Sequence, residues 1–592
     1  MTGAAADAVA RVVVDSPLPQ LDRLFDYRVP AALADAVAPG VRVRVPVRAQ
    51  RRILDGFVVE VTATSSFEGA LADLEEVVSP VSVLAPEVWA LARRVADRAA
   101  GAASDVLRLA IPKRQVRVER AHAASPPVAL PAVEPLPLTG YPEPLGDAIV
   151  AGARLVVHAA PRPLAWARTA VELASRVLAD DRSALLVLPD ARDIGRLLDV
   201  AAELLPAERI VRLDAEQPSA ARYRAFLRAR HETGLLLVGS RAAAYAPAAN
   251  LGLTLVWDDG DPALREPHAP GVHAREVALL RQEQQGGALV LLTHSPSTDA
   301  QRLVELGWCR EARPSGRVVP DVLPTALQTG ADRIAEHARI PSSAWRLASD
   351  ALRDGPVLVQ VARPGEEAPG GSVRTAADLG RAFPNARVVV ADAAHPIDRV
   401  GPESSLVIAT RGAEPVAAGG YRAVLLLDGE RMLARESLRV VEDCLRSWAN
   451  ATALAAPGAR IALVGVGGRI GREFAAWRLA VLASAELADR RAARMPPAVR
   501  TATLIGRASA VEAAIAAAGI SGDDVLAPVR LADDALRAIV RFDYRRGQEV
   551  AAALRTEILR HATGRRPRGG SAPTLRVRMD DQEPFLAPGD LG

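Results

Sequence analysis

Short apolar segments alternate with helical stretches over most of the chain, and this pattern constrains the fold more than any other feature. A first series comprises residues 154–158, 183–188, 235–239, 253–257 and 288–292. A second series comprises residues 356–361, 387–391, 405–409, 422–427 and 460–464. Strands that are apolar along their whole length are typical of parallel sheets covered by helices on both faces. The pattern therefore predicts two successive α/β units that form similar lobes.

Smaller modules are predicted on either side of these lobes. In the first, segments 9–14, 40–47 and 56–61 are predicted strands, and residues 86–110 have helical spacing. In the last, strand-like segments at 500–506, 537–543 and 574–579 surround a helix-like stretch at 547–562, which suggests a small α+β sandwich. Prolines crowd residues 113–146 and disfavour regular structure there. The predicted parts are therefore an N-terminal module (1–112), a linker (113–146), two lobes (147–315 and 316–483) and a C-terminal module (484–592).

The composition allows several packed cores, because 49% of the 592 residues are hydrophobic. Only 4% are aromatic, so Val, Leu and Ala must fill those cores. The net charge of +3 is weak evidence for a nucleic-acid partner. The N-terminus has no basic segment followed by an apolar one, and no uncharged apolar run approaches the roughly 18 residues of a membrane span. We therefore expect a cytoplasmic protein without a membrane partner.

Cysteine and lysine are too scarce for two common kinds of site. With only Cys309 and Cys444, a four-cysteine zinc site is impossible and a disulfide framework is implausible. Lys113 is the only lysine among the 73 basic residues, a bias that GC-rich codons explain. Any chemistry that needs a lysine must therefore use Lys113.

The loop after the first strand of the first lobe is the natural phosphate site, because ligands bind beyond the carboxyl ends of parallel strands. A phosphate cradle needs glycines, a lysine and a Ser or Thr for the metal. The loop has none of these and instead carries Ala159, Ala160, Arg162 and Ala165, with two prolines that lack N–H groups. It predicts no ordinary triphosphate binding, and Arg162 is more simply an exposed structural arginine than an anion ligand.

Two further spots in the first lobe carry polar chemistry. Trp257, Asp258, Asp259 and Gly260 follow an apolar strand. Carboxylates there could hold Mg²⁺ and orient a water, but without a phosphate loop beside them we favour a solvated acidic loop. Arg241 follows Gly and Ser at another strand end, where it could contact a phosphate backbone.

Basic residues gather in both terminal modules. The N-terminal ribbon carries Arg42, Arg44, Arg48, Arg51 and Arg52, which suit phosphate contacts but equally suit a solvated face. Nearby Phe25, Asp26 and Tyr27 offer aromatic rings that either stack on a base or pack in a core. The C-terminal module also contains a group of arginines that either bind nucleic acid or are solvated. This group comprises Arg541, Arg545, Arg546, Arg565, Arg566 and Arg568.

In this order, the segments resemble the primosomal protein N′ (PriA) family of replication-restart helicases over nearly the whole chain. The resemblance is carried by residues 25–30 (FDYRVP), 40–46 (GVRVRVP), 56–59 (GFVV) and 104–112 (SDVLRLAIP), which look like the family's 3′-end-binding domain. Residues 238–242 (VGSRA) and 250–253 (NLGL) resemble a stretch of the first helicase lobe, and 495–497 (MPP) and 576–581 (RVRMDD) resemble the family's ending. The resemblance implies a β-rich 3′-end DNA-binding domain, two RecA-like lobes and a small C-terminal α+β domain.

The departures from the family are systematic. The phosphate loop is replaced at 159–166, the Asp-Glu-Glu-His motif at 257–260, the Ser-Ala-Thr-Pro motif at 293–296 and the arginine-finger motif near 445–453. The eight zinc cysteines are absent, 113–146 is too short for the winged helix, and Arg48 stands where a glycine of the 3′-end pocket is expected. The pattern is that of a degenerate actinobacterial-type member that lacks the helicase motifs. We expect no enzymatic activity and no bound ATP, Mg²⁺ or zinc, since phosphoryl transfer needs these parts together.

The leading hypothesis is a non-hydrolysing protein of replication restart at the nucleoid. It binds forked or 3′-ended DNA and recruits primosome proteins, replicative-helicase-loading proteins and single-stranded-DNA-binding protein. By the resemblance, Asp26 senses the 3′ end between Phe25 and Tyr27. The expected phosphate contacts are Arg48, Arg51, Arg52, Arg241, Arg545 and Arg546. The alternatives are an ATP-dependent 3′→5′ helicase with a divergent nucleotide site, and an interaction scaffold with a vestigial DNA surface.

Overall fold

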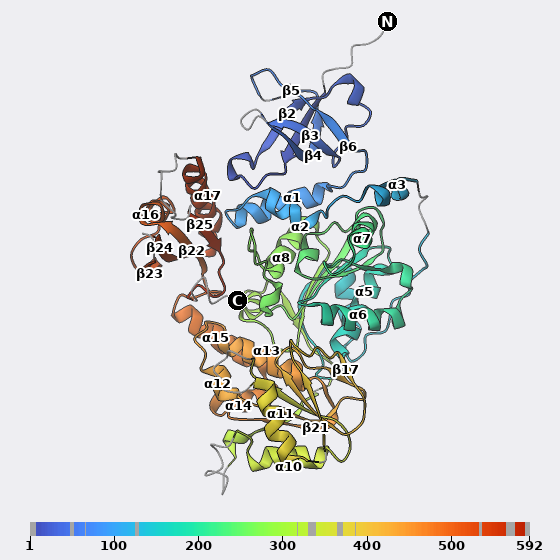
Figure 1. The fold of residues 1–592 in the computed structure, drawn as a ribbon, viewed down its shortest axis with the longest axis vertical. Helices are drawn as coiled ribbons and strands as arrows, with labels where there is room; N and C mark the ends of the chain where they lie inside the picture. The colour runs from blue at the N-terminus through green and yellow to red at the C-terminus, as the bar shows by residue number, and fades with distance from the viewer. Residues whose placement is uncertain are drawn as a thin grey trace.

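Four larger sheets, each with its own helices, build the described part of the chain (Figure 1). The computed structural model describes residues 8–47, 52–65, 67–124, 129–316, 318–328, 339–363, 371–384, 386–531, 535–563 and 575–585. The N-terminal sheet and the second lobe lie at opposite ends of the long axis, with the first lobe between them. The C-terminal sheet lies to one side, where α17 packs against α1.

The N-terminal sheet is mostly antiparallel. Its strands, in order across the sheet, are β5 (Ala72–Asp73), β2 (Leu24–Arg28), β1 (Val9–Val14), β4 (Arg52–Thr62), β3 (Arg42–Val47) and β6 (Glu76–Ser79). The predicted strands 9–14, 40–47 and 56–61 are confirmed, the last as part of the longer β4. Alternate side chains such as Val12, Val43 and Tyr27 form a core that belongs to this sheet.

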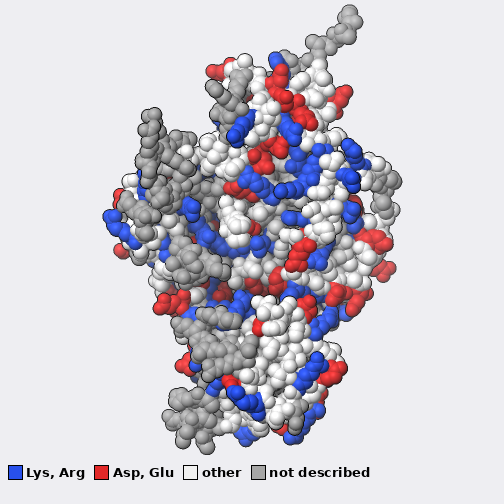
Figure 2. Space-filling model, in the orientation of Figure 1, with Lys and Arg blue, Asp and Glu red and all other residues white. Residues whose placement is uncertain are grey.

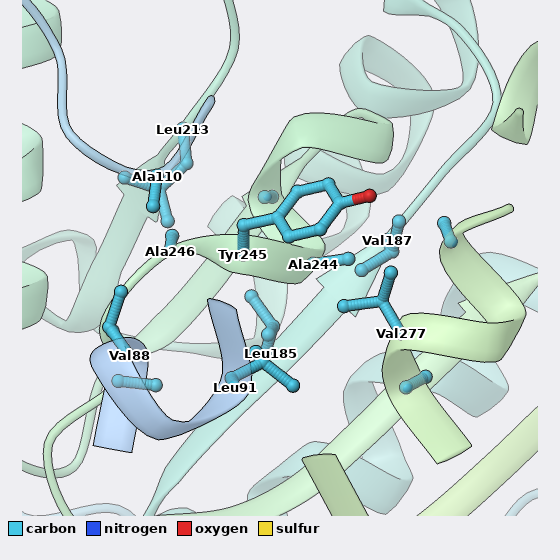
Figure 3. Packing of buried hydrophobic residues seen from close by; sticks show 14 of the residues in the cluster. Val88, Leu91, Ala110, Leu185, Val187, Leu213, Ala244, Tyr245, Ala246 and Val277 are labelled. Atoms are coloured by element: carbon cyan, nitrogen blue, oxygen red, sulfur yellow. The ribbon is translucent and has the colours of Figure 1, made fainter. Parts of the chain in front are cut away.

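The helical stretch predicted at 86–110 is interrupted. It forms α1 (Pro86–Arg98) and α2 (Ala103–Ala110), and the chain turns between them where Ala100 adopts a positive φ of 52°. Both helices share one apolar cluster with the first lobe (Figure 3), in which Val88 and Leu91 lie near Leu185 and Val277. This shared core fixes the N-terminal domain on the first lobe.

The first lobe contains a fully parallel sheet. In order across the sheet, its strands are β13 (Arg310–Ala312), β7 (Arg154–His158), β12 (Ala288–Thr293), β11 (Leu251–Trp257), β8 (Ser183–Val187), β10 (Leu236–Gly239) and β9 (Ile210–Arg212). Its helices are α4 (Pro144–Val150), α5 (Ala165–Leu178), α6 (Ala191–Leu204), α7 (Ser219–His231), α8 (Ala274–Gln285) and α9 (Thr298–Glu305). The five predicted strands are confirmed, whereas β9 and β13, each of three residues, are too short to show a pattern.

The second lobe repeats this architecture with another parallel sheet. Its strands are β14 (Asp321–Pro324), β21 (Ala455–Leu463), β20 (Tyr421–Leu426), β15 (Val357–Val361), β18 (Ser405–Thr410) and β16 (Arg387–Ala391). Its helices are α10 (Ser342–Ala351), α11 (Gly371–Ala382), α12 (Gly429–Leu433), α13 (Val440–Thr452), α14 (Gly468–Ala475) and α15 (Leu479–Ala492). A small sheet of β17 (Arg399–Val400) and β19 (Val416–Ala417) lies on the side of the first lobe. The five strands predicted for this lobe are confirmed.

The expectation of no regular structure at 113–146 is wrong in part. Helix α3 (Val116–Ala124) forms there and packs against α7. The buried Glu119 explains its stability, because it accepts hydrogen bonds from the Arg114 guanidinium at 2.5 Å and from the Tyr223 hydroxyl. A hydrophobic pattern alone does not reveal a helix that is anchored by a buried carboxylate.

The C-terminal domain is an antiparallel sheet covered by two helices. Its strands are β23 (Val525–Arg530), β24 (Ala535–Phe542), β22 (Arg500–Arg507) and β25 (Arg576–Met579), and its helices are α16 (Ala508–Ala517) and α17 (Gly547–Thr563). Three strands and α17 follow the prediction, whereas β23 and α16 were not predicted. In the described part of the whole chain, no helix is both long and apolar enough to cross a membrane.

Candidate nucleic-acid interface

The candidate end-binding residues Phe25, Asp26 and Tyr27 lie on β2. Because side chains alternate along a strand, Phe25 and Tyr27 contact the core of the N-terminal sheet, while Asp26 points to the opposite face. Tyr27 is 4% exposed, its hydroxyl donates to the Pro46 carbonyl at 3.2 Å, and burial raises its pKa to about 12. The Tyr27 ring therefore supports the pocket from within, and Phe25 is only half-buried.

Asp26 is held by two neighbours. Its Oδ2 accepts a hydrogen bond from the Ser65 hydroxyl at 2.6 Å, and its Oδ1 lies 3.7 Å from Nε of Arg11. The carboxylate is thus oriented but keeps 11% of its side-chain surface exposed. An oriented acceptor of this kind suits the hydroxyl of a terminal sugar.

The arginines of the ribbon differ in their surroundings. Arg52 is exposed at the start of β4, opposite Val47 of β3. Arg44 is also exposed, but it pairs with Asp55 at 3.3 Å and Glu76 at 3.1 Å. Arg48 and Arg51 lie outside the described residues. Of the ribbon residues singled out for DNA contacts, Arg52 is therefore the one whose surroundings can be assessed.

The other arginines predicted to contact DNA also differ in their surroundings. The guanidinium of Arg241 donates to Glu266 at 3.2 Å and to the Ala263 carbonyl at 3.4 Å, so it serves the first lobe itself. Arg546 donates to the Ala518 carbonyl and to Glu549, each at 2.8 Å. Arg545 beside it is exposed. Residues 564–574, with Arg565, Arg566 and Arg568, lie outside the described residues.

Three N–H groups of the loop at the phosphate position donate hydrogen bonds to backbone carbonyls of the first lobe. The N–H of Ala159 donates to the Thr293 carbonyl at 2.8 Å, that of Arg162 to the Ala160 carbonyl at 2.8 Å, and that of Ala165 to the Arg162 carbonyl at 3.1 Å. Leu164 caps α5 with a positive φ of 57° and offers no side-chain acceptor. As expected from the sequence, Arg162 is exposed. These three N–H groups of the loop are therefore engaged within the lobe.

An aromatic cluster occupies the space next to this loop. The Trp166 ring, at the start of α5, stacks on the Trp257 ring at 4.2 Å between centroids and 11° between planes. His294 meets Trp257 edge-on at 5.3 Å, and burial lowers the His294 pKa to about 4, so the imidazole is neutral. Trp257 Nε1 donates to Asp193 at 3.0 Å. Trp166, Trp257 and His294 thus form one packed unit.

The expectation that the acidic cluster is a solvated loop is wrong. Asp258 is 2% exposed and Asp259 is fully buried. Oδ2 of Asp258 accepts from Nη1 of Arg446 and from Nδ2 of Asn450, both at 2.7 Å. Oδ2 of Asp259 accepts from Ser297 at 2.5 Å and Arg275 at 3.1 Å. Asp258 thus contacts helix α13 of the second lobe, whereas Asp259 is held by residues of the first lobe itself.

The carboxylates of Asp258 and Asp259 are paired with the guanidinium groups of Arg446 and Arg275. Burial raises the pKa of Asp258, while the neighbouring Arg446 lowers it. The positive charge of the Arg446 guanidinium compensates the charge of the ionised Asp258 carboxylate. The same guanidinium also contacts Asp261 at 2.8 Å. No group of three or more His, Cys, Asp or Glu that could hold a metal occurs within the described ranges. The acidic cluster therefore serves as one side of a contact between the lobes.

Helix α13 of the second lobe supplies the other side. Glu442, Arg446 and Asn450 on α13, with Arg439 just before it, recur at helical spacing and face the first lobe. Arg439 pairs with Asp299 at 2.7 Å, and Glu442 accepts from the Thr298 hydroxyl at 2.7 Å. Sequence reasoning missed this stripe, although its spacing of three and four residues was visible.

A cavity of about 270 Å³ remains between the lobes. Its lining includes Trp166, Trp257 and Asp258, together with six arginines. These are Arg162, Arg192, Arg196, Arg363, Arg411 and Arg446. Arg192 also bridges the lobes, since it pairs with Asp398 at 3.0 Å and donates to the Ile397 carbonyl at 2.7 Å. Ion pairs and hydrogen bonds thus connect the two lobes beside this cavity.

A β-rich N-terminal domain, two lobes with parallel sheets and a small C-terminal α+β domain define a multidomain α/β protein. Residues 11–112 match the family described as "3'DNA-binding domain (3'BD)", and residues 491–583 match "Primosomal protein N C-terminal domain". The chain is 36% identical to the "Probable replication restart protein PriA" of Mycobacterium tuberculosis (strain ATCC 25618 / H37Rv), over 91% of this chain and 96% of that protein. The protein of the same description from Mycobacterium leprae (strain TN) is 34% identical over the same shares. The chain belongs to the PriA family.

Solved structures with related layouts are more distant. The structure of RecG bound to a three-way DNA junction matches with a TM-score of 0.34 and 11% identity, over 69% of this chain and 56% of that chain. Dbp5 of S. cerevisiae bound to RNA and ADP BeF3 matches with a TM-score of 0.34 and 9% identity, over 57% of this chain and 84% of that chain. Likenesses of this extent do not bear on what the chain does.

Proposed function

We propose that this PriA-family protein acts in replication restart by binding forked or 3′-ended DNA and recruiting the replication machinery, without hydrolysing ATP. The 3′ DNA-binding domain and the near full-length likeness to replication restart proteins support the DNA-binding part. The observation that carries the non-hydrolysing part is the Asp258 carboxylate, which Arg446 and Asn450 hold beside the stacked Trp166 and Trp257 rings. Contacts within the protein engage one oxygen of this carboxylate and three N–H groups of the loop, which supports the absence of ATP hydrolysis.

The recruiting role follows from the same reasoning. A chain that keeps four packed domains but lacks the residues for ATP hydrolysis can still bind partners through its surfaces, although it does not turn over ATP. Its partners are then primosome proteins, loaders of the replicative helicase and single-stranded-DNA-binding protein. The DNA interface comprises Asp26 and Phe25, supported by Tyr27, and the exposed Arg545. It also includes Arg48, Arg51 and Arg52. Arg241 and Arg546 mainly make contacts within the protein.

The test combines DNA binding with ATP turnover. Fluorescence anisotropy with a forked DNA that carries a free 3′-hydroxyl is compared with the same fork blocked by a 3′-phosphate. We expect a preference for the free end, which Asp26→Asn abolishes. The matched control is Asp73→Asn, which changes an exposed carboxylate on the same sheet. Equal affinity of wild type for both forks contradicts end recognition.

The second part of the test is ATP hydrolysis with and without the fork. We expect no turnover above background in either case. DNA-stimulated turnover that Asp258→Ala abolishes contradicts the proposal and supports a helicase with a divergent nucleotide site. Absence of DNA binding even at low salt supports instead an interaction scaffold with a vestigial DNA surface.

A further inference from the structure

A second cavity, of about 430 Å³, lies where the N-terminal sheet, helix α2 and helix α7 of the first lobe meet. Its sheet residues Val13 and Phe57 belong to the core shared with the first lobe, and Asp26 lies on the same face of the sheet, opposite Arg11 of β1. Its size falls in the range of about 300–1,000 Å³ that is typical of ligand sites. No role has so far been assigned to this cavity.

The lining of the cavity is strongly cationic. It contains Arg42 from β3, Arg108 from α2, Lys113 just after α2 and Arg222 from α7, against one carboxylate, Asp15. Arg108 is already neutralised, since it pairs with Asp15 at 2.8 Å and with Asp105 at 2.9 Å. The other three cations form no ion pair with any carboxylate among the described residues. The cavity therefore carries an excess of positive charge that two separate domains contribute.

Arg42 shows that this charge is directed inward. Its guanidinium lies over the Phe57 ring at 4.9 Å, and its Nε and Nη2 atoms are buried without a hydrogen-bond acceptor in the described part of the chain. Buried guanidinium N–H groups without an acceptor are unfavourable and are normally paired. An anion in the cavity would supply the missing acceptor.

Two further features suit a nucleotide unit. Helix α7 begins at Ser219, which lines the cavity, and no side chain caps its first N–H groups. These N–H groups and the helix dipole favour an anion at this end. The apolar wall of Phe57, Leu107 and Ile111 suits a sugar or a base beside the phosphate.

We propose that this cavity binds a backbone phosphate, with its adjoining nucleoside, of a single DNA strand that passes between the N-terminal domain and the first lobe. The proposal rests on the DNA-binding function proposed above and adds a second contact site to it. Figure 2 shows Lys and Arg side chains gathered between the N-terminal sheet and the first lobe, which suits a polyanion more than one small anion. The site would fix the path of the strand relative to both domains.

The first experiment uses the exposed Lys113 as a reporter, because it is the only lysine in the chain. The full chain is acetylated with an amine-reactive ester with and without a 20-nucleotide oligothymidine, and modification of Lys113 is measured by mass spectrometry. The α-amino group serves as the internal reference. We expect the strand to slow acetylation of Lys113 at least about fivefold while the reference is unchanged. Equal acetylation with and without saturating strand overturns the proposal.

The second experiment measures anisotropy of the labelled oligothymidine over a salt series. Lys113→Gln and Arg222→Gln are each expected to weaken binding about three- to tenfold and to reduce the salt slope by about one. Lys113→Arg retains the affinity. The control is Arg353→Gln on the second lobe, which removes an exposed arginine (78% side-chain exposure) and changes nothing.

The outcomes separate the two proposals and the two sources of phosphate. If wild type binds no strand, the proposed function fails and this site fails with it. If wild type binds the strand and both glutamine variants bind it as tightly as wild type does, only the proposed site is overturned. Thymidine monophosphate is added as a competing probe: protection of Lys113 by this nucleotide but not by the strand overturns the assignment to DNA in favour of a free nucleotide.

Discussion

The Trp166 ring stacks on the Trp257 ring with centroids 4.2 Å apart, although the two residues start a helix and end a strand that are 91 positions apart in sequence. Both rings are almost fully buried. They lie at the positions where the family resemblance places the phosphate loop and the metal carboxylates. Side chains that pack in this way stabilise the lobe at the place where the resemblance puts a nucleotide site.

Trp257→Ala is expected to destabilise the first lobe by about 3–5 kcal/mol, because it removes a large buried ring and leaves a cavity. The urea midpoint, followed by tryptophan fluorescence and circular dichroism, measures the loss. Trp345→Ala is the control, since that ring is 42% exposed and stacks on Phe383 in the second lobe. A larger effect for Trp345 than for Trp257 contradicts the role given to the stack.

Asp258→Ala is expected to loosen the contact between the lobes at a cost of roughly 3 kcal/mol, because Asn450 loses its acceptor and Arg446 keeps only the partly exposed Asp261. Hydrogen exchange of α13 should accelerate, and the urea midpoint should fall. Arg399→Ala removes an exposed inter-lobe pair with Asp199 at 2.6 Å and is expected to cost less than about 1 kcal/mol. Unchanged exchange in α13 of the Asp258 variant would count against a lock between the lobes.

Arg545→Gln and Arg546→Gln are expected to behave differently although the residues are adjacent. Arg545 is exposed, so its loss should weaken fork binding at all sequences and lower the salt slope by about one. Arg546 is engaged by the Ala518 carbonyl and Glu549, so its loss should affect stability more than the salt slope. Salt titrations by anisotropy distinguish the two, and equal slopes for both variants contradict this assignment.

Asp299 is expected to make the stability depend on acid pH. Burial raises its pKa, but Arg275 at 2.8 Å and Arg439 at 2.7 Å outweigh that effect and hold the pKa below its usual value. The unfolded chain takes up a proton near pH ~3.9 and the folded chain only at lower pH, so this stabilisation is present above about pH 4 and is lost as the pH falls through the folded pKa. Asp299→Asn should lower the urea midpoint near neutral pH and flatten its decrease in acid. Asp350→Asn, an exposed carboxylate (72% side-chain exposure), should leave both unchanged.

The fold was largely predictable from the sequence because its signals are local. Each predicted strand of the two lobes is a continuous apolar segment, and such segments are buried on both faces of a parallel sheet whatever their neighbours are. The exceptions have physical reasons: β9 and β13 are too short, α3 depends on the buried Glu119, and Ala100 divides the predicted helix at 86–110.

The candidate sites were less predictable because they depend on partners that are distant in sequence. From the sequence alone, Asp258 is interpreted as part of a solvated acidic loop beside Gly260. Only the approach of α13 buries it against Arg446, which is 188 residues away. Likewise, Arg42 and Arg222 belong to different domains, and neither residue alone indicates that they line one cavity with Lys113.

The sequence by itself determined which residue types were missing: one lysine, two cysteines and a loop without glycine exclude a lysine-based phosphate loop at 159–166 and a four-cysteine zinc site. These are properties of residue types, and no arrangement in space can restore them. Only the tertiary structure decided what replaced that chemistry. Charges and rings from separate segments come together only when the domains pack, and they then form a stacked Trp166–Trp257 pair, a closed contact between the lobes and a cationic cavity beside the N-terminal domain.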